Sequence, residues 1–262
     1  MRVPSGYCDL RVEHINANII DAYVKHGYSL IAVNTTVNCS LLGVSSSNKK
    51  KRKIAECNDE VKVNEDKDWI PIPKSTNVCN HHNLKLTILN RLTIQITNIG
   101  QLQQTLNARN FPKYNILAVE PLNDHLFQNL VTSPSVDIII CKVKTKITPK
   151  DYSVAVDKNI HFELSYAPML MDSVTRQNTL TLAHMLHIKG KSKNIILTSG
   201  AINRLDIRNP YDAMNLGFLL GFSRKQTKES ITDCCHSVIL KSYGRKLGKS
   251  AINLMPIKTT SS

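Results

Sequence analysis

Several side chains that could take part in hydrolysis lie at the ends of short apolar segments of the sequence. A hydrolytic site in an α/β barrel needs clustered His, Asp or Glu at the carboxyl ends of its strands. The positions that fall there are Asp9, His14, Asn34, Glu120, Cys141, Glu163 and Ser199. This set is too sparse for a two- or three-metal site, and its spacing specifies no Ser-His-Asp or Cys-His arrangement. Glu163 is interpreted as a barrel-interior acid paired with a basic group.

Three short motifs are similar to ligand-binding motifs but are better explained as ordinary parts of helices, loops and turns. Cys234-Cys235-His236 suggests zinc, yet adjacent cysteines on a helix point in different directions and no second ligand pair has suitable spacing. His81–His82 is interpreted as a solvated loop pair. Gly190-Lys191-Ser192 matches the end of a phosphate loop without its preceding glycine, so a helix-to-strand turn is expected. We therefore predict no catalytic residue, no metal ion and no cofactor.

Basic side chains make a stronger case for function. The chain has 34 Lys and Arg against 20 Asp and Glu, and its net charge of +14 favours an anionic partner such as nucleic acid. Residues 1–140 carry a net charge of +3, and residues 141–262 carry +11. Aromatic residues make up only 5% of the chain, which fits structured RNA read by shape better than single strands bound by stacking. The candidate RNA contacts are Arg176, Arg204, Arg208, Lys191, Lys193, Arg224, Lys225, Arg245 and Lys246.

These candidates divide between the two ends of a barrel. Arg176 opens a helix after one strand and Arg204 and Arg208 follow the next, so these three are expected together at the C-terminal rim. The turn that holds Lys191 and Lys193 precedes a strand and must lie at the opposite end, where it reaches either RNA or protein. Residues 224–228 start a further helix, where an anion would also meet free N–H groups.

One polar segment breaks the strand–helix rhythm. Residues 40–83 are charged and poor in periodicity, which predicts a surface insertion that is partly disordered. Within it stand five consecutive positive charges, which are interpreted as a nuclear import signal: Lys49, Lys50, Lys51, Arg52 and Lys53. The domain prediction is a single α/β-barrel domain over residues 1–255, followed by a flexible tail over 256–262.

Short, nearly continuous apolar segments predict strands covered on both faces, as in a parallel sheet flanked by helices. The segments are 7–12, 27–34, 84–97, 114–121, 136–141, 160–168 and 193–200. Arg91 interrupts one of them, and a helix that starts at Asp172 or Ser173 and stops at Gly190 precedes the last. About seven strand–helix repeats favour a TIM-like (β/α) barrel, with a doubly wound open sheet as the alternative.

The stretch IRNPYDAMNLGFLLGFSRKQ (207–226) predicts two consecutive helices. Asn209 and the proline after it suit the start of the first helix, and Ser223 opens a capping box at the start of the second. Gly217 and Gly221 would each cost about 1 kcal/mol against alanine inside a helix. We therefore expect both glycines on the inner face, where they let the helix approach the strands.

Cysteine content and hydropathy indicate the cellular environment of the protein. Seven cysteines, an odd number with no CxxC pair, favour free thiols in a reducing environment. No signal-peptide core is visible at the N-terminus, and no segment approaches the ~18 apolar residues of a membrane span. No membrane partner is expected.

Four segments resemble a known family: FELSYAPMLMDSVTRQ (162–177), KGKSKNIILTSGA (189–201), LDIRNPYDAMNLGFLLGFS (205–223) and LTILNRLTI (86–94). CDLRV and GYSLIAVN are similar to the opening strands of the same family. It is the family of the thirty-kilodalton protein subunit of eukaryotic nuclear ribonuclease P and ribonuclease MRP.

The resemblance implies a TIM-barrel-like protein without a catalytic centre, located in the nucleus and nucleolus. In that family the RNA subunit removes the 5′ leader of precursor tRNA, and the protein supports RNA folding and assembly. The implied partners are ribonuclease P RNA, ribonuclease MRP RNA, a small α/β protein subunit and other protein subunits, with precursor tRNA met indirectly. The alternative is a metal-dependent phosphoesterase, since the barrel is similar to the polymerase and histidinol phosphatase superfamily. Those enzymes open with paired histidines, whereas this chain has YCDLRVEH there.

Overall fold

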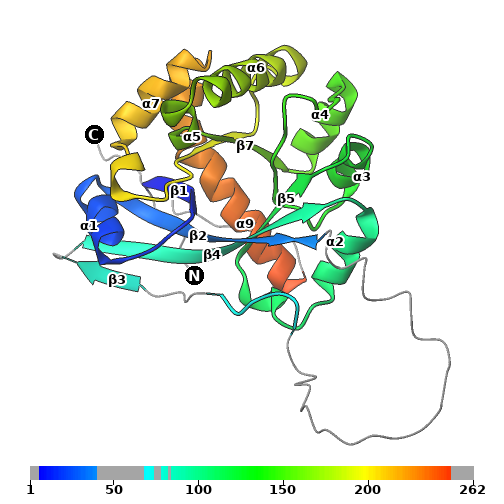
Figure 1. Cartoon of the computed structure of the whole chain (residues 1–262), viewed down its shortest axis with the longest axis horizontal. Helices are drawn as coiled ribbons and strands as arrows, with labels where there is room; N and C mark the ends of the chain where they lie inside the picture. The colour runs from blue at the N-terminus through cyan, green and yellow to red at the C-terminus, as the bar shows by residue number, and fades with distance from the viewer. Residues whose placement is uncertain (1–5, 40–67, 74–77, 82–83, 249–262) are drawn as a thin grey trace, which may run out of the picture.

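The computed structural model describes residues 6–39, 68–73, 78–81 and 84–248 (Figure 1). The predicted import cluster Lys49–Lys53, most of the predicted insertion and the predicted tail lie outside the described residues.

Seven parallel strands form a nearly closed barrel in the order β1-β2-β4-β5-β6-β7-β8. They are β1 Tyr7–Val12, β2 Tyr28–Asn38, β4 Leu84–Ile96, β5 Ile116–Pro121, β6 Ile138–Ile139, β7 His161–Ser165 and β8 Ile195–Thr198. The two outermost strands meet at their C-terminal ends. There the Glu13 N–H donates to the Ala201 carbonyl at 2.9 Å, and the Gly200 N–H donates to the Arg11 carbonyl at 3.0 Å. The prediction of a TIM-like barrel is confirmed.

An eighth strand, β3 Val78–His81, pairs antiparallel with the first residues of β4. The interpretation of His81 as part of a loop is wrong, because its main chain is in this strand, while His82 lies outside the described residues. Strand β4 itself runs unbroken through Arg91. Arg91 interrupts the apolar pattern, as expected, but not the strand, because its charge is paired inside the barrel.

Most of the helices lie around the outside of the strands, as Figure 1 shows. They are α1 Ala17–Lys25, α2 Ile99–Leu106, α3 Leu126–Thr132, α4 Pro149–Asp157, α5 Ala167–Met171, α6 Ser173–Gly190, α7 Pro210–Leu219, α8 Arg224–Ser230 and α9 Asp233–Leu247, with 3-10 turns at Phe111–Lys113 and Arg204–Asp206. Asp172 caps α6 by accepting the Thr175 N–H at 2.8 Å, so the predicted start and end of that helix are confirmed. None of the described helices is both long and apolar enough to cross a lipid bilayer.

Helix α9 has a different position and closes the barrel at the N-terminal ends of the strands. In Figure 1 it crosses the middle of the ring of helices. Cys235, Val238 and Ile239 are buried at 0–1% exposure and pack on the inward-facing apolar side chains of the strands. Lys241 Nζ donates to the carbonyl of Val136, which precedes β6. The barrel interior is therefore apolar at this end and is completed by α9.

The two glycines near the end of α7 have different roles from the one expected. A β-carbon on Gly217 would lie 2.8 Å from Thr227 Cγ2 and 3.4 Å from Phe222 Cδ2, so this glycine allows close approach to α8 rather than to the strands. Gly221 lies beyond α7, exposed, with φ +87°, and a β-carbon there would touch nothing within 4 Å. Gly221 thus makes a left-handed turn between the helices.

Gly217→Leu is expected to lower the free energy of unfolding by about 1–3 kcal/mol, because the larger side chain overpacks the contact between α7 and α8. Thermal and urea unfolding measure the loss. Gly221→Asn is the control, since asparagine tolerates a positive φ and the position is open. A Gly217→Leu variant as stable as the wild type would contradict the close packing of α7 on α8.

Candidate functional site

A buried ion pair occupies the interior of the barrel towards the C-terminal ends of the strands. Arg91 of β4 is 0% exposed, and its two terminal nitrogens donate to the Glu163 carboxylate of β7 at 2.7 and 2.5 Å. Thr198 Oγ1 donates to the same carboxylate at 2.8 Å. The Arg91 guanidinium holds the pKa of Glu163 below its usual value against the opposing effect of burial. The interpretation of Glu163 as an interior acid paired with a basic group is confirmed.

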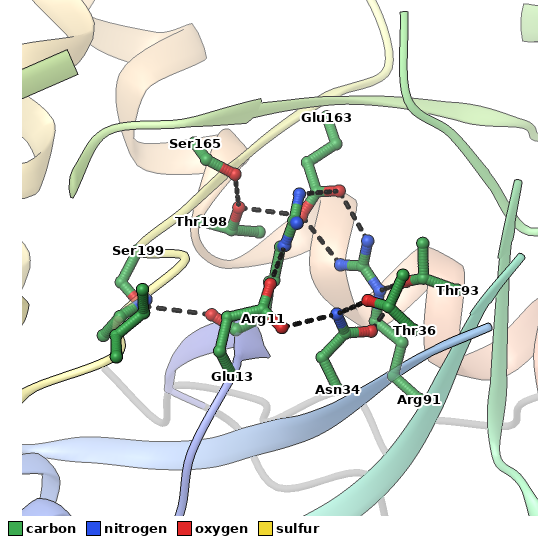
Figure 2. A network of polar contacts seen from close by, with 12 residues as sticks. Arg11, Glu13, Asn34, Thr36, Arg91, Thr93, Glu163, Ser165, Thr198 and Ser199 are labelled. Carbon is green, nitrogen blue, oxygen red and sulfur yellow. Dashed lines mark hydrogen bonds and ion pairs between the residues drawn. The ribbon is translucent and has the colours of Figure 1, made fainter. Parts of the chain in front are cut away.

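The polar contacts continue outward to the mouth of the barrel (Figure 2). Arg11 Nε donates to Glu13 at 2.6 Å, and Arg11 Nη1 lies 3.7 Å from Glu163 Oε2. Asn34 donates to the other Glu13 oxygen at 2.9 Å and accepts from Thr93 at 2.6 Å. We call the residues labelled in Figure 2 the mouth network: Arg11, Glu13, Asn34, Thr36, Arg91, Thr93, Glu163, Ser165, Thr198 and Ser199. Its carboxylates are engaged by the chain's own cations and amides.

Asp9 closes the seam between β1 and β8. It is 2% exposed and accepts hydrogen bonds from Tyr23 Oη at 2.7 Å and from the Ser199 N–H at 3.1 Å. Burial raises the pKa of the Asp9 carboxyl, while these donors oppose the rise. Asp9 and Ser199 are therefore hydrogen-bonded to each other, and this contact joins β1 to the end of β8.

Of the remaining strand-end candidates, Glu120 has partners, Cys141 is buried and His14 is exposed. Glu120 accepts from Gln95 Nε2 at 2.8 Å and lies 2.9 Å from Lys142 Nζ. Burial raises the pKa of the Cys141 thiol, which keeps it neutral, and His14 lies exposed beside a hollow at the barrel mouth. Cys235 is fully buried, and burial raises the pKa of its thiol, whereas Cys234 is half-buried.

The three rim arginines lie at one end of the barrel, as expected from their positions after strands. Arg176 is in the first turn of α6, which follows β7, and its guanidinium donates to the carbonyls of Met169 and Leu170. Arg204 and Arg208 follow β8, and both are exposed. Large apolar side chains stand exposed on the same segments: Met171 (72%), Val174 (63%), Ile202 (54%) and Leu205 (84%).

The structure joins two groups of basic residues that the sequence left separate. Lys191 and Lys193 lie in the turn before β8, as predicted, and Gln226 Nε2 of α8 donates to the Lys191 carbonyl at 2.7 Å. Arg224 and Lys225, at the start of α8, are therefore at the same end of the barrel. Fewer backbone N–H groups than expected are free at the start of α8, because the Gln226 N–H donates to Ser223 Oγ at 3.3 Å.

Of the two candidate RNA contacts on α9, Arg245 is engaged within the fold and Lys246 is exposed. Arg245 Nη2 donates to Asp137 at 2.7 Å and to the Asn115 carbonyl at 3.0 Å, and its guanidinium lies 5.1 Å from the centre of the Phe111 ring. The positive charge of Arg245 is neutralised within the fold by Asp137. Lys246 is exposed at the end of the helix.

Sequence reasoning missed Arg11 and Arg91, which are the cations of the mouth network. A signal was present, because an arginine in the middle of an apolar strand needs a buried partner, and Glu163 was already the expected interior acid. The alternation of side chains along β4 and β7 is consistent with both on the inner face, but only the strand order of the closed barrel brings them into contact.

Fold and site define a TIM-like α/β barrel whose mouth is occupied by a charge-paired network of its own side chains. Within the part of the chain that the structure describes, no three His, Cys, Asp or Glu side chains are grouped so as to hold a metal ion.

The chain belongs to the ribonuclease P subunit p30 family, which it matches over residues 6–247. It is 30% identical to ribonuclease P protein subunit p30 of Mus musculus over 233 residues, covering 87% of this chain and 81% of the mouse protein. It is 24% identical to ribonuclease P protein subunit drpp30 of Dictyostelium discoideum, covering 87% of this chain and 61% of that protein. The family resemblance seen in the sequence is confirmed.

The fold has a counterpart among solved structures. A chain in the cryo-EM structure of archaeal ribonuclease P with mature tRNA superimposes with a TM-score of 0.63 at 13% identity. The match covers 97% of this chain and 100% of the archaeal chain. At this level of identity the likeness concerns the fold.

Proposed function

We propose that this chain is a non-catalytic protein subunit of ribonuclease P, and also of ribonuclease MRP, that binds structured RNA and partner proteins. In this proposal the RNA subunit removes the 5′ leader of precursor tRNA, and the chain supports its folding and assembly. The observation that carries the proposal is membership of the p30 family along nearly the whole chain. The relatives are named as ribonuclease P protein subunits.

The chemistry of the barrel mouth supports a non-catalytic role. Hydrolases on such barrels act with side chains at the C-terminal ends of the strands. Here two guanidinium groups, of Arg11 and Arg91, lie against Glu163. A bound divalent cation would be repelled by both, and the carboxylate it needs already accepts three donors. The donor set therefore does not suit a metal-dependent phosphoesterase.

The proposed partners are ribonuclease P RNA, ribonuclease MRP RNA, the small α/β subunit and further proteins of the particle, in the nucleus and nucleolus. The charge of +14 supports an RNA partner, and Lys49–Lys53 supports nuclear import. The rim arginines Arg176, Arg204 and Arg208 stay proposed RNA contacts. The exposed apolar side chains beside them make a protein contact the other possible outcome.

Affinity purification of the tagged full chain, with sequencing of the co-purifying RNA, tests the proposal. A structured nuclear RNA that processes tRNA is expected, together with the other protein subunits. The purified chain with added manganese or zinc is expected to hydrolyse neither phosphoesters nor precursor tRNA. Metal-dependent cleavage that disappears in Glu163→Gln, or purification without any such RNA, would contradict the proposal. In the same purification, replacing the three rim arginines with alanine shows whether RNA or a protein is lost.

A further inference from the structure

A small hollow lies at the end of the barrel opposite to the mouth network. It has a volume of about 230 Å³ and is bounded by one side of α4 and by the turn between α6 and β8. Three lysines line it: Lys189, Lys191 and Lys193. Its other lining residues are Pro149, Tyr152, Ser153, Val156 and Gly190. No carboxylate is among them, although the flanking helix α4 contains Asp151 and Asp157.

The three ammonium groups are free to meet a ligand. Lys191 and Lys193 are exposed and Lys189 is half-buried, and none of the three has an ion-pair partner among the described residues. Asp151 is engaged elsewhere, since it accepts from Thr148 Oγ1 at 2.7 Å at the start of α4. The hollow is therefore a concave site with three uncompensated positive charges.

The turn that carries the lysines has an unusual backbone. Lys191, Ser192 and Asn194 have φ values of 53°, 55° and 52°, in the left-handed region that favours glycine. Each non-glycine residue in that region costs on the order of 1 kcal/mol. Such conformations persist where surrounding contacts fix them, and they are frequent at ligand-binding sites.

Surrounding side chains hold this turn from several directions. Tyr152 Oη donates to the Lys193 carbonyl at 2.5 Å, and Gln226 Nε2 donates to the Lys191 carbonyl at 2.7 Å. His187 Nδ1 lies 3.1 Å from Ser192 Oγ, and Asn194 Nδ2 donates to the Ile160 carbonyl at 3.2 Å. The backbone bearing the lysines is thus fixed before any ligand arrives, which reduces the entropic cost of binding.

We propose that this hollow, with Lys189, Lys191 and Lys193, binds a phosphodiester group in the backbone of structured RNA. Lysine ammonium groups act on phosphate as point charges, and such contacts position RNA without reading its sequence. Tyr152 is 1% exposed, so the hollow has no aromatic face from this residue for a base to stack on. Arg224, on the neighbouring α8, extends the positive surface along the same end, whereas Lys225 beside it lies 3.6 Å from Glu229. The inference rests on the proposed function and adds the surface that meets the RNA.

The test compares RNA binding of the full chain with that of a triple variant, Lys189→Gln, Lys191→Gln and Lys193→Gln. The probe is an in vitro transcript of ribonuclease P RNA, titrated at several salt concentrations. We expect the affinity to fall at least tenfold near physiological salt. The slope of log affinity against log salt is expected to fall by roughly 0.7–0.9 for each lost phosphate contact. Lysine-to-arginine replacement at the three positions should retain most of the affinity and the slope.

A matched control removes three lysines at the other end of the barrel. Lys142, Lys144 and Lys146 are exposed in the segment after β6, and their replacement with glutamine changes the net charge equally, although Lys142 also gives up its ion pair with Glu120. This control should keep the salt slope closer to that of the wild type. Tyr152→Phe removes the bond to the turn without changing charge, so it should weaken binding while leaving the slope nearly unchanged.

The outcomes separate the inference from the proposed function. Equal losses in the two lysine triple variants would overturn the inference, because they would show a general charge effect. Unchanged affinity in the Lys189, Lys191 and Lys193 variant, with intact wild-type binding, would also overturn it and leave the proposed function in place. If that variant loses binding of inorganic phosphate but not of the transcript, the hollow binds a free anion and the inference fails. A wild-type chain that neither binds the transcript nor co-purifies with RNA would refute the proposed function itself.

Discussion

Glu163→Ala is expected to lower the free energy of unfolding by about 3–5 kcal/mol, because it leaves the Arg91 guanidinium buried without its counter-charge. Arg91 is 0% exposed and has both terminal nitrogens on this carboxylate, so water cannot replace the lost partner. Urea unfolding at neutral pH measures the loss. Joint replacement, Arg91→Met with Glu163→Leu, should recover most of the stability because no unpaired charge remains. A single variant as stable as the wild type would contradict the buried pair.

The same pair gives a defined dependence on pH. The pKa of Glu163 is lowered in the folded protein. At acidic pH the folded protein therefore binds fewer protons at this site than the unfolded chain does. The stability it contributes is fully present above the unfolded pKa of about 4.3 and is lost as pH falls through the folded pKa. The difference in stability between wild type and Glu163→Gln should therefore shrink as the pH is lowered below about 4. A difference that grows on acidification would contradict the assignment.

Gly190→Ala is expected to destabilise the fold by about 3 kcal/mol, although alanine is the better helix former by about 1 kcal/mol. A β-carbon at this position would lie 2.0 Å from Tyr152 Cε1. The ring cannot move freely, because Tyr152 is 1% exposed and its hydroxyl is bonded to the Lys193 carbonyl. Thermal unfolding measures the loss, and Tyr152→Leu in the same chain should relieve part of it.

Gly100→Ala is the matched control for that experiment. Gly100 is also in a helix, α2, but it is exposed and its β-carbon would come no closer than 3.9 Å to another atom. This substitution should leave stability unchanged or raise it slightly. If the two variants behave alike, helix propensity and not the Tyr152 contact decides the effect at residue 190.

Local patterns in the sequence predicted the barrel but not its charged interior. Apolar strand segments and helix caps, such as Asp172 before α6, are determined by residues close in the sequence. The strands and helices that they mark were predicted correctly. The partner of Glu163 was not identified, because Arg91 lies 72 residues away and only the closed strand order brings the two together. The role of Gly217 was misplaced for the same reason, since its contact with Thr227 depends on how α7 and α8 cross.

The sequence identified the basic residues of the surface but not which of them lie close together. Lys191 and Lys193 were placed at the correct end by the rule that turns before and after a strand lie at opposite ends. Their proximity to Gln226 on α8 is a tertiary contact with no periodic signal. The sequence GKSKN also gives no sign that Lys191, Ser192 and Asn194 adopt positive φ, because these conformations are imposed by surrounding side chains.

The position of α9 has a consequence for biosynthesis. The apolar end of the barrel interior is covered by Cys235, Val238 and Ile239, yet the last strand ends at Thr198. At roughly 5–20 residues per second, a ribosome would finish β8 about 2–7 seconds before it reaches the start of α9. During that interval the nascent barrel would expose its inward-facing side chains from Cys8 to Ile196. Such an exposed apolar surface is prone to aggregation until α9 covers it.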